Sequence, residues 1–303
     1  MNENTYDLAI IGGGPAGLTA AIYGKRYGLN TVVLSDSFGG MMSTAHKICN
    51  YPGFNEIAGM DLSQKMIDQV TSLEVEIVFE KVIDVVNNSS FFVVNTDQRT
   101  IKAKKVILAI GRARRKLNIK REEELTGKGV SYCATCDAGF YKEKVVGVIG
   151  GSDAAVTAAI MLSEIAKKVY IIYRKDQLRA EKVWIDHVNN NKKIEVLYNQ
   201  EVKELLGKEK LEKIKLLEDK ELDVDGIFIE IGSIPNTELL KKIAVEIDEN
   251  GYIKVNKDQK TNVSGIYACG DSTNSTTLKQ VVTACSQGAI CAYNCYLDIK
   301  ENK

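Results

Sequence analysis

The chain has 303 residues, with 40 basic side chains, 40 acidic side chains and seven cysteines. This length allows about two domains, and the balanced charge gives no general field that would attract nucleic acid or an anionic membrane. An odd number of cysteines in a long chain is typical of a reducing cytoplasm and not of a disulfide-stapled secreted protein. We therefore expect a cytoplasmic protein that binds neither nucleic acid nor membrane.

The chain opens with a nucleotide-binding pattern. A short buried strand is predicted at residues 6–11, and Gly12, Gly14 and Gly17 follow it in G-x-G-x-x-G spacing before an apolar helical segment. The first glycine makes the turn, the second lets the backbone approach a pyrophosphate, and the third lets the helix pack on the strand. The helix N-terminus can then bind the phosphates. A merely glycine-rich turn is the alternative interpretation.

The remainder of the first unit reads as alternating elements. A strand is predicted at residues 31–34, and Asp36 near its end can accept a ribose hydroxyl. The charged run from Arg112 to Lys116 indicates a solvated crossover to another domain. The other elements expected in this unit are one helix and three strands, at residues 59–72, 75–79, 91–95 and 106–109.

The second unit contains the segment Cys133-Ala134-Thr135-Cys136-Asp137. Cys-x-x-Cys spacing lowers a thiol pKa and favours thiolate attack on a disulfide, and Asp137 is a candidate proton donor for the departing thiolate. Zinc would need a second pair of ligands, which neither His46 nor His187 supplies, so no metal site is expected. A static disulfide across so short a loop stabilises little. The pair is therefore predicted to be redox-active.

The second unit then repeats the opening motif. After a strand predicted at residues 145–149, Gly150-Gly151-Ser152-Asp153-Ala154 opens a helix in register with the pattern that begins at Gly12. Ser152 replaces the middle glycine, the position at which the backbone comes closest to the pyrophosphate. Two such units in one chain imply two dinucleotide sites.

The next strand, predicted at residues 168–173, ends without the carboxylate that binds the ribose of NAD. Arg174, Lys175 and Arg179 instead place positive charge where a 2′-phosphate would lie. An ordinary basic surface loop is the alternative interpretation. Short strands without recognisable chemistry are expected between residues 189 and 225.

The C-terminal part predicts a strand at residues 265–269, then Gly270 and Asp271, then a helix from about 277 to 297. A Gly-Asp pair between a strand and a helix N-terminus suits the ribityl and phosphate part of a flavin dinucleotide. The cysteines of this helix cannot converge on one metal ion, and we expect them in the core.

These motifs resemble, along nearly the whole chain, the low-molecular-weight thioredoxin reductase family. The resemblance implies an α/β fold of two Rossmann-like, three-layer (ββα) nucleotide-binding domains, the second inserted in the first. Residues 1–114 and 242–303 would form an FAD-binding domain, and residues 115–241 an NAD(P)H-binding-like domain with the dithiol. The matching segments are residues 12–17, Asn50-Tyr51-Pro52-Gly53, 133–137, Pro235-Asn236-Thr237 and Gly270-Asp271.

The resemblance also implies FAD, NADPH as electron donor, a thioredoxin-like partner protein and a homodimer. Cys136 would face the flavin, Cys133 would attack the partner's disulfide, and Asp137 would be the acid. The residues assigned to FAD are Gly12, Gly14, Pro15, Ala16, Gly17, Asp36, Gly39, Gly40, Asn50, Val82, Gly111, Gly270, Asp271, Lys279, Gln280 and Val281. Those assigned to NADPH are Gly150, Gly151, Ser152, Asp153, Ala154, Arg174, Lys175 and Arg179.

Two departures from the family pattern leave the donor open. Ser152 interrupts the second glycine pattern, and Tyr173-Arg174-Lys175 stands where His-Arg-Arg is usual, while some family members take electrons from reduced ferredoxin. Met41, Ile110 and Lys279 also depart from the family, without affecting FAD binding.

The inserted domain is expected to rotate about linkers near residues 112–117 and 238–244, because the dithiol must meet first the flavin and then a large protein. A flavin-dependent oxidase or peroxide reductase and a non-catalytic redox sensor are the alternatives from other functional classes.

Overall fold

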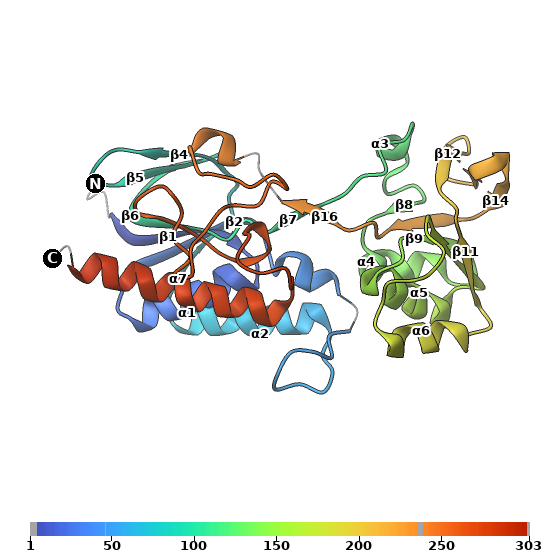
Figure 1. Cartoon of the computed structure of the whole chain (residues 1–303), viewed down its shortest axis with the longest axis horizontal. Coiled ribbons are helices and arrows are strands. Elements are labelled where there is room, and N and C mark those ends of the chain that lie inside the picture. Colours follow the sequence, from blue (N-terminus) through green and yellow to red (C-terminus); the bar gives the residue numbers. More distant parts are fainter. Residues whose placement is uncertain (1–4, 46, 236–238, 302–303) are drawn as a thin grey trace. The chain divides into compact units, whose positions relative to one another are not determined.

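The computed structural model describes residues 5–45, 47–235 and 239–301, so that His46, Asn236 and Thr237 lie outside the described residues. The chain forms two compact units, each of which has a parallel sheet with helices (Figure 1). The first unit contains Met1–Ser43, Ile48–Ala113 and Ile234–Lys303, and the second contains Thr44–Lys47 and Arg114–Ser233. The α/β class with two Rossmann-like units, one inserted in the other, is confirmed.

The first unit is built on a sheet with strand order β3-β2-β1-β6-β5-β4, in which β17 also pairs with β6. The pairs joining β3, β2, β1, β6 and β17 are parallel, and β4 and β5 add an antiparallel edge. The parallel strands are apolar because both of their faces are buried. The bounds are β1 Tyr6–Gly13, β2 Thr31–Phe38, β3 Glu76–Val78, β4 Val82–Asn87, β5 Phe92–Thr96, β6 Thr100–Leu108 and β17 Ile266–Ala268.

Helices α1 (Pro15–Arg26), α2 (Gly59–Ser72) and α7 (Val281–Glu301) belong to the same unit. Helices α1 and α7 pack so closely that a Cβ atom on Gly288 would lie 2.1 Å from the carbonyl oxygen of Ala16. The predicted helix at residues 59–72 is confirmed, whereas α7 begins at Val281 and not near residue 277. Short 3-10 turns complete the unit: η1 Gly40–Thr44, η4 Leu239–Lys242 and η5 Gly270–Ser272.

The second unit has a parallel sheet with strand order β11-β10-β9-β15-β8 and a small antiparallel sheet β12-β13-β14. The predicted strands at 145–149 and 168–173 are confirmed as β9 and β10. The other strands are β8 Val130–Ser131, β11 Ile194–Tyr198, β12 Val202–Leu206, β13 Lys213–Leu216, β14 Glu221–Asp223 and β15 Gly226–Ile229. The helices and turns are α3 Glu122–Leu125, α4 Ala134–Asp137, η2 Ala138–Tyr141, α5 Asp153–Ile165, α6 Lys182–Asn189 and η3 Leu217–Asp219.

The two main crossings between the units pair with each other. Strands β7 (Arg112–Arg114) and β16 (Ser233–Pro235) form a two-stranded sheet, so the run from residue 112 is an extended strand at its start. Leu240 and Ile243 pack in the core of the first unit. The second crossing therefore lies at residues 233/234, before the 241/242 boundary expected from the sequence. None of the described helices combines the length and apolar character that crossing a membrane requires.

Candidate active site

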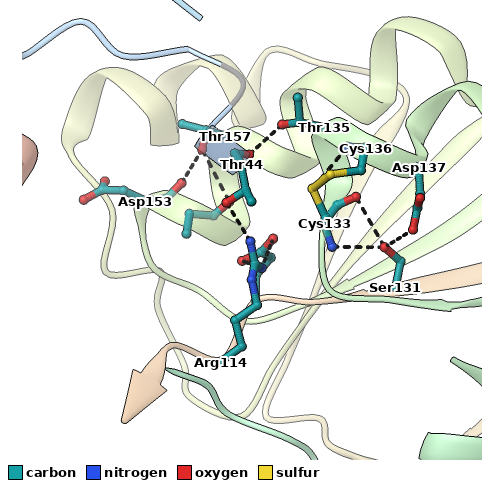
Figure 2. A network of polar contacts seen from close by, with 11 residues as sticks. Thr44, Arg114, Ser131, Cys133, Thr135, Cys136, Asp137, Asp153 and Thr157 are labelled. Atoms are coloured by element: carbon teal, nitrogen blue, oxygen red, sulfur yellow. Dashed lines mark hydrogen bonds and ion pairs between the residues drawn. A yellow bond between two sulfur atoms is a disulfide. The ribbon is translucent and has the colours of Figure 1, made fainter. Parts of the chain in front are cut away.

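The cysteine pair lies at the start of a short helix in the second unit. Cys133 follows strand β8 and caps α4, and it forms a disulfide with Cys136 (Figure 2). The backbone N–H of Cys136 donates to Sγ of Cys133 at an N–S distance of 3.2 Å. A hydrogen bond to sulfur favours the charged form of a thiol. When the disulfide is reduced, this contact therefore stabilises a thiolate on Cys133.

A serine links the two ends of the motif. The Ser131 hydroxyl donates to Oδ2 of Asp137 at 2.7 Å and accepts the backbone N–H of Cys133 at 3.0 Å (Figure 2). Ser131 ends strand β8 and is only 3% exposed. The sequence placed Ser131 two residues before Cys133 but gave it no role, because only the tertiary contact with Asp137 reveals one.

The two sulfur-bearing residues differ in exposure. Cys136 is exposed, Cys133 is half-buried, and Asp137 is also half-buried. Exposure by itself would favour Cys136 as the sulfur that meets the partner protein. The assignment of Cys133 to the partner and of Cys136 to the flavin therefore stays a prediction.

The β1–α1 turn of the first unit has the geometry of a dinucleotide site. Gly12 has a φ of +113°, and a Cβ there would lie 2.2 Å from the Ala109 carbonyl oxygen. A Cβ on Gly17 would lie 1.9 Å from the Gly12 carbonyl oxygen. Strand, turn and helix thus touch through backbone, which only glycine permits at these two positions.

Gly14 has a different part in the same turn. Its φ of −79° is open to any residue, and a Cβ there would meet only the Gly40 Cα, at 4.0 Å. Among the described residues, no side chain caps α1, whose first turn includes Pro15 and Ala16. The free N–H groups at this end and the open space over Gly14 fit the pyrophosphate of FAD.

The structure brings the other residues assigned to FAD to the same unit. Gly39 donates its N–H to the Gly13 carbonyl oxygen at 2.8 Å, and Asn50 Nδ2 donates to Gln280 Oε1 at 3.2 Å, directly before Val281 begins α7. Burial raises the pKa of Asp271 in η5, and burial lowers the pKa of Lys279.

The structure also places four further residues that were assigned to FAD. Strand β2 continues to Phe38, so exposed Asp36 lies within the strand and not beyond its end. Val82 begins β4, a strand the sequence did not predict, and Gly111 follows β6 with a φ of +59°. A Cβ on Gly270 would lie 3.0 Å from Ala16 Cβ in the first turn of α1, and the Gly270 N–H donates to Gln287 Oε1 at 2.7 Å.

Two aromatic residues near this turn were missed. The ring of Phe38 packs on Gly13, and the exposed ring of Phe79 lies beside it, with centroids 4.7 Å apart and the ring planes tilted by 57°. An aromatic side chain left exposed at the carboxyl edge of a parallel sheet is suited to stack on a base. A Phe at the end of β2 and another just after β3 were the available signals.

The second nucleotide turn keeps the geometry of the first despite its serine. Gly150 has a φ of +142°, and a Cβ there would lie 2.2 Å from the Glu230 carbonyl oxygen. Ser152 has φ −95° and ψ 179°, close to the −79° and −178° of Gly14. The serine therefore does not disturb the turn, and its side chain makes no hydrogen bond that caps α5.

The segment after β10 lies against this second turn. The backbone N–H of Arg179 donates to the Gly151 carbonyl oxygen at 2.7 Å, and that of Glu181 donates to Asp153 Oδ1 at 2.7 Å. The ring of Tyr173 packs on Gly151 and is only 6% exposed. Within the described residues, the Tyr173 hydroxyl has no hydrogen-bond partner.

The basic residues assigned to NADPH are available for a ligand. Arg174, Lys175 and Arg179 are exposed, as is Ala154 in the first turn of α5. In the part of the chain that the structure describes, none of the three basic side chains makes an ion pair. This geometry permits a 2′-phosphate contact.

An ion pair that the sequence did not predict lies beside the first crossing. Arg114 Nη1 lies 3.2 Å from both carboxylate oxygens of Glu230, and Arg114 Nη2 donates to Thr44 Oγ1 at 2.7 Å. The Thr44 carbonyl oxygen accepts the Thr135 hydroxyl at 2.7 Å (Figure 2). All four residues belong to the second unit. Burial raises the pKa of Glu230, and Arg114 opposes that shift.

The remaining cysteines are mostly in the core. Cys269, Cys291 and Cys295 are fully buried, and burial raises the pKa of Cys291 and Cys295 well above the usual value. Cys285 is half-buried, and Cys49 is exposed. Among the described residues, no three His, Cys, Asp or Glu side chains are grouped so that they could hold a metal ion.

Comparisons with known proteins identify the family of this chain. The family model for pyridine nucleotide-disulphide oxidoreductases matches residues 6–288. A thioredoxin reductase of Peptoclostridium acidaminophilum is 40% identical over 303 residues, covering 96% of each chain. The crystal structure of Lactococcus lactis thioredoxin reductase in its FR conformation has a TM-score of 0.93 at 34% identity, covering 98% of this chain and 100% of that chain. A ferredoxin-flavin thioredoxin reductase of Clostridium acetobutylicum has a TM-score of 0.55 at 34% identity, covering 98% of this chain and 99% of that chain.

Proposed function

Because this chain belongs to the thioredoxin reductases of the pyridine nucleotide-disulphide oxidoreductase family, we propose that it passes electrons from NADPH through FAD to Cys133–Cys136 and on to a thioredoxin. That it is a flavin-dependent disulfide oxidoreductase follows from the family. The donor, the partner and the role of each residue are the proposal. The observation that supports it best is the Cys133–Cys136 disulfide, with a hydrogen-bond donor on Cys133 Sγ and an acid fixed nearby by Ser131.

Bound FAD supplies the electron pair that reduces the disulfide. In the dithiol, the Cys133 thiolate attacks the partner's disulfide, so that a mixed disulfide forms and one partner thiolate departs. Asp137 gives its proton to that thiolate and takes the proton of Cys136. The Cys136 thiolate then attacks Cys133 Sγ, the enzyme disulfide re-forms, and the second partner thiolate takes the proton now on Asp137. Two electrons and two protons pass to the partner.

A protein is a more fitting substrate than a small disulfide. Phe140, three residues after Asp137, is 74% exposed, the largest exposed fraction among the described large apolar residues. An exposed aromatic ring beside a reactive group is suited to bury itself against a protein partner. A homodimer remains an expectation from the family.

NADPH is the donor that the second unit supports. Ser152 preserves the turn that a pyrophosphate needs, and Arg174, Lys175 and Arg179 offer exposed positive charge that forms no ion pair within the described residues. Reduced ferredoxin is the second candidate. Tyr173-Arg174-Lys175 stands where His-Arg-Arg is usual in the family, and one structural neighbour is a ferredoxin-flavin thioredoxin reductase.

An anaerobic titration distinguishes the two donors. Holoprotein mixed with NADPH, NADH or reduced ferredoxin is followed by flavin absorbance. Bleaching by NADPH supports the first donor, whereas a flavin that stays oxidised with NADPH and bleaches with ferredoxin selects the second.

An insulin-reduction assay with thioredoxin tests turnover, because a redox sensor gives none. An oxidase would keep its oxygen consumption in a Cys136→Ser variant.

A further inference from the structure

The Ser131 hydroxyl has one hydrogen and two acceptors within reach. Its oxygen lies 2.7 Å from Asp137 Oδ2 and 3.3 Å from the Cys133 carbonyl oxygen, and it also accepts the Cys133 N–H at 3.0 Å. An ionised carboxylate only accepts hydrogen bonds, whereas a protonated one also donates. The hydroxyl can therefore serve both states of Asp137 by turning its hydrogen.

We propose that Ser131 is the positioning residue for proton transfer by Asp137, an inference that rests on the proposed function. When Asp137 is ionised, the Ser131 hydrogen points to Oδ2. When Asp137 holds its proton, Ser131 accepts that hydrogen bond and donates instead to the Cys133 carbonyl oxygen. The carboxyl group keeps its place in both states, as a group that must give and take protons requires.

The surroundings support this role. Ser131 is 3% exposed at the end of β8, so the hydroxyl is fixed and does not exchange its partners for water. Among the described residues, Oδ1 of Asp137 makes no hydrogen bond, so Ser131 is the side chain that holds this carboxyl group, through Oδ2. Burial raises the pKa of Tyr141 in η2, and the nearby charges of Asp137 and Asp225 raise it further.

In this step the Asp137 O–H bond breaks as an S–H bond forms on the partner's departing thiolate. Asp137 regains a proton when the Cys136 S–H bond breaks. No electrons pass through Ser131, and its own O–H bond stays intact. The residue therefore affects only reactions whose leaving thiolate needs a proton.

The leaving group supplies the test. Dithiol-reduced holoprotein is mixed in stopped flow either with oxidised thioredoxin, whose leaving thiolate is aliphatic, or with the aromatic disulfide dithiobis-nitrobenzoate, whose thiolate is stable unprotonated. Ser131→Ala should slow the thioredoxin reaction about tenfold, as expected for loss of a hydrogen bond to a charged group, and leave the aromatic reaction unchanged. Asp137→Asn should slow the first reaction at least as much. Adding Ser131→Ala to Asp137→Asn should cost nothing further.

Ser163→Ala is the matched control, because it also removes a buried hydroxyl from the second unit and should change neither rate. Equal slowing of both reactions by Ser131→Ala, or losses that multiply with Asp137→Asn, overturns the proposal. So does a Ser131→Ala variant with wild-type rates. If wild-type protein fails to react with thioredoxin, the proposed function is wrong, and the same comparison with the aliphatic hydroxyethyl disulfide still tests Ser131.

Discussion

The backbone N–H of Cys136 lies 3.2 Å from Sγ of Cys133, and none of the described residues donates an equivalent hydrogen bond to Cys136 Sγ. A thiolate on Cys133 is therefore the better stabilised of the two. We expect the reduced Cys136→Ser variant to be alkylated by iodoacetamide near neutral pH about tenfold faster than reduced Cys133→Ser, the factor typical of a hydrogen bond to a charged group. Only Cys136→Ser should trap a mixed disulfide with thioredoxin.

This test separates the effect of thiol acidity on the alkylation rate from the effect of solvent exposure. Cys136 is the more exposed residue, so exposure alone predicts the opposite order of alkylation. Both variants are compared in a Cys49→Ser background, because Cys49 is an exposed free thiol. If Cys133→Ser is alkylated faster, Cys136 and not Cys133 is the sulfur that attacks the partner's disulfide.

Gly14 and Gly17 differ in what a methyl group would meet. Gly17→Ala would place Cβ 1.9 Å from the Gly12 carbonyl oxygen and should destabilise the first unit, because backbone cannot move aside cheaply. Gly14→Ala meets only Gly40 Cα at 4.0 Å and should preserve the fold. If FAD phosphates lie over Gly14, this second variant should still lose flavin on dialysis. Thermal unfolding and flavin absorbance measure the two effects separately.

The basic residues after β10 predict cofactor choice. Arg174→Ala and Arg179→Ala should each raise KM for NADPH about tenfold, as expected for loss of a charge-assisted contact, and leave KM for NADH unchanged. Lys192→Ala, an exposed basic residue of the same unit, is the control. Ser152→Gly should lower KM for NADPH if the serine side chain crowds the pyrophosphate. If these variants raise KM for NADH by the same factor as KM for NADPH, the two arginines do not act on the 2′-phosphate.

Burial of Glu230 predicts a pH-dependent stability. Because its folded pKa is raised above the usual 4.5, the folded state holds this proton more tightly than the unfolded state. The contribution of Glu230 to stability is therefore present below pH 4.5 and lost as pH rises through the raised folded pKa. Glu230→Gln lacks this loss, so the stability of the variant relative to wild type should improve as the pH rises above 4.5. Urea unfolding across this range measures the slope, and a constant difference between the proteins contradicts it.

Rotation of the inserted unit, as the family leads us to expect, predicts the effect of a cross-link. Joining the two units covalently should stop repeated reduction of thioredoxin. A single reduction of the Cys133–Cys136 disulfide by the flavin should remain possible. Cleavage of a reversible cross-linker should restore the rate. Undiminished turnover in the cross-linked protein would show that rotation is unnecessary.

Much of this protein could be predicted from the sequence, for local reasons. The helix at 59–72 and the strands at 145–149 and 168–173 follow from hydrophobic periodicity bounded by turn residues. The glycine spacing at residues 12–17 is likewise local, since one turn joins strand to helix. Strand β4 was missed because half-exposed residues such as Ile83 and Val86 weaken its pattern.

What the sequence by itself determined was the chemistry present: two nucleotide turns, a dithiol and an acid, each encoded in a few consecutive residues. Only the tertiary structure decided which groups act on one another. The Ser131–Asp137 contact, the Arg114–Glu230 pair and the matching conformations of Gly14 and Ser152 depend on how separate segments meet. The physical reason is that hydrogen-bond direction and burial are set by packing, to which residues distant in the chain contribute.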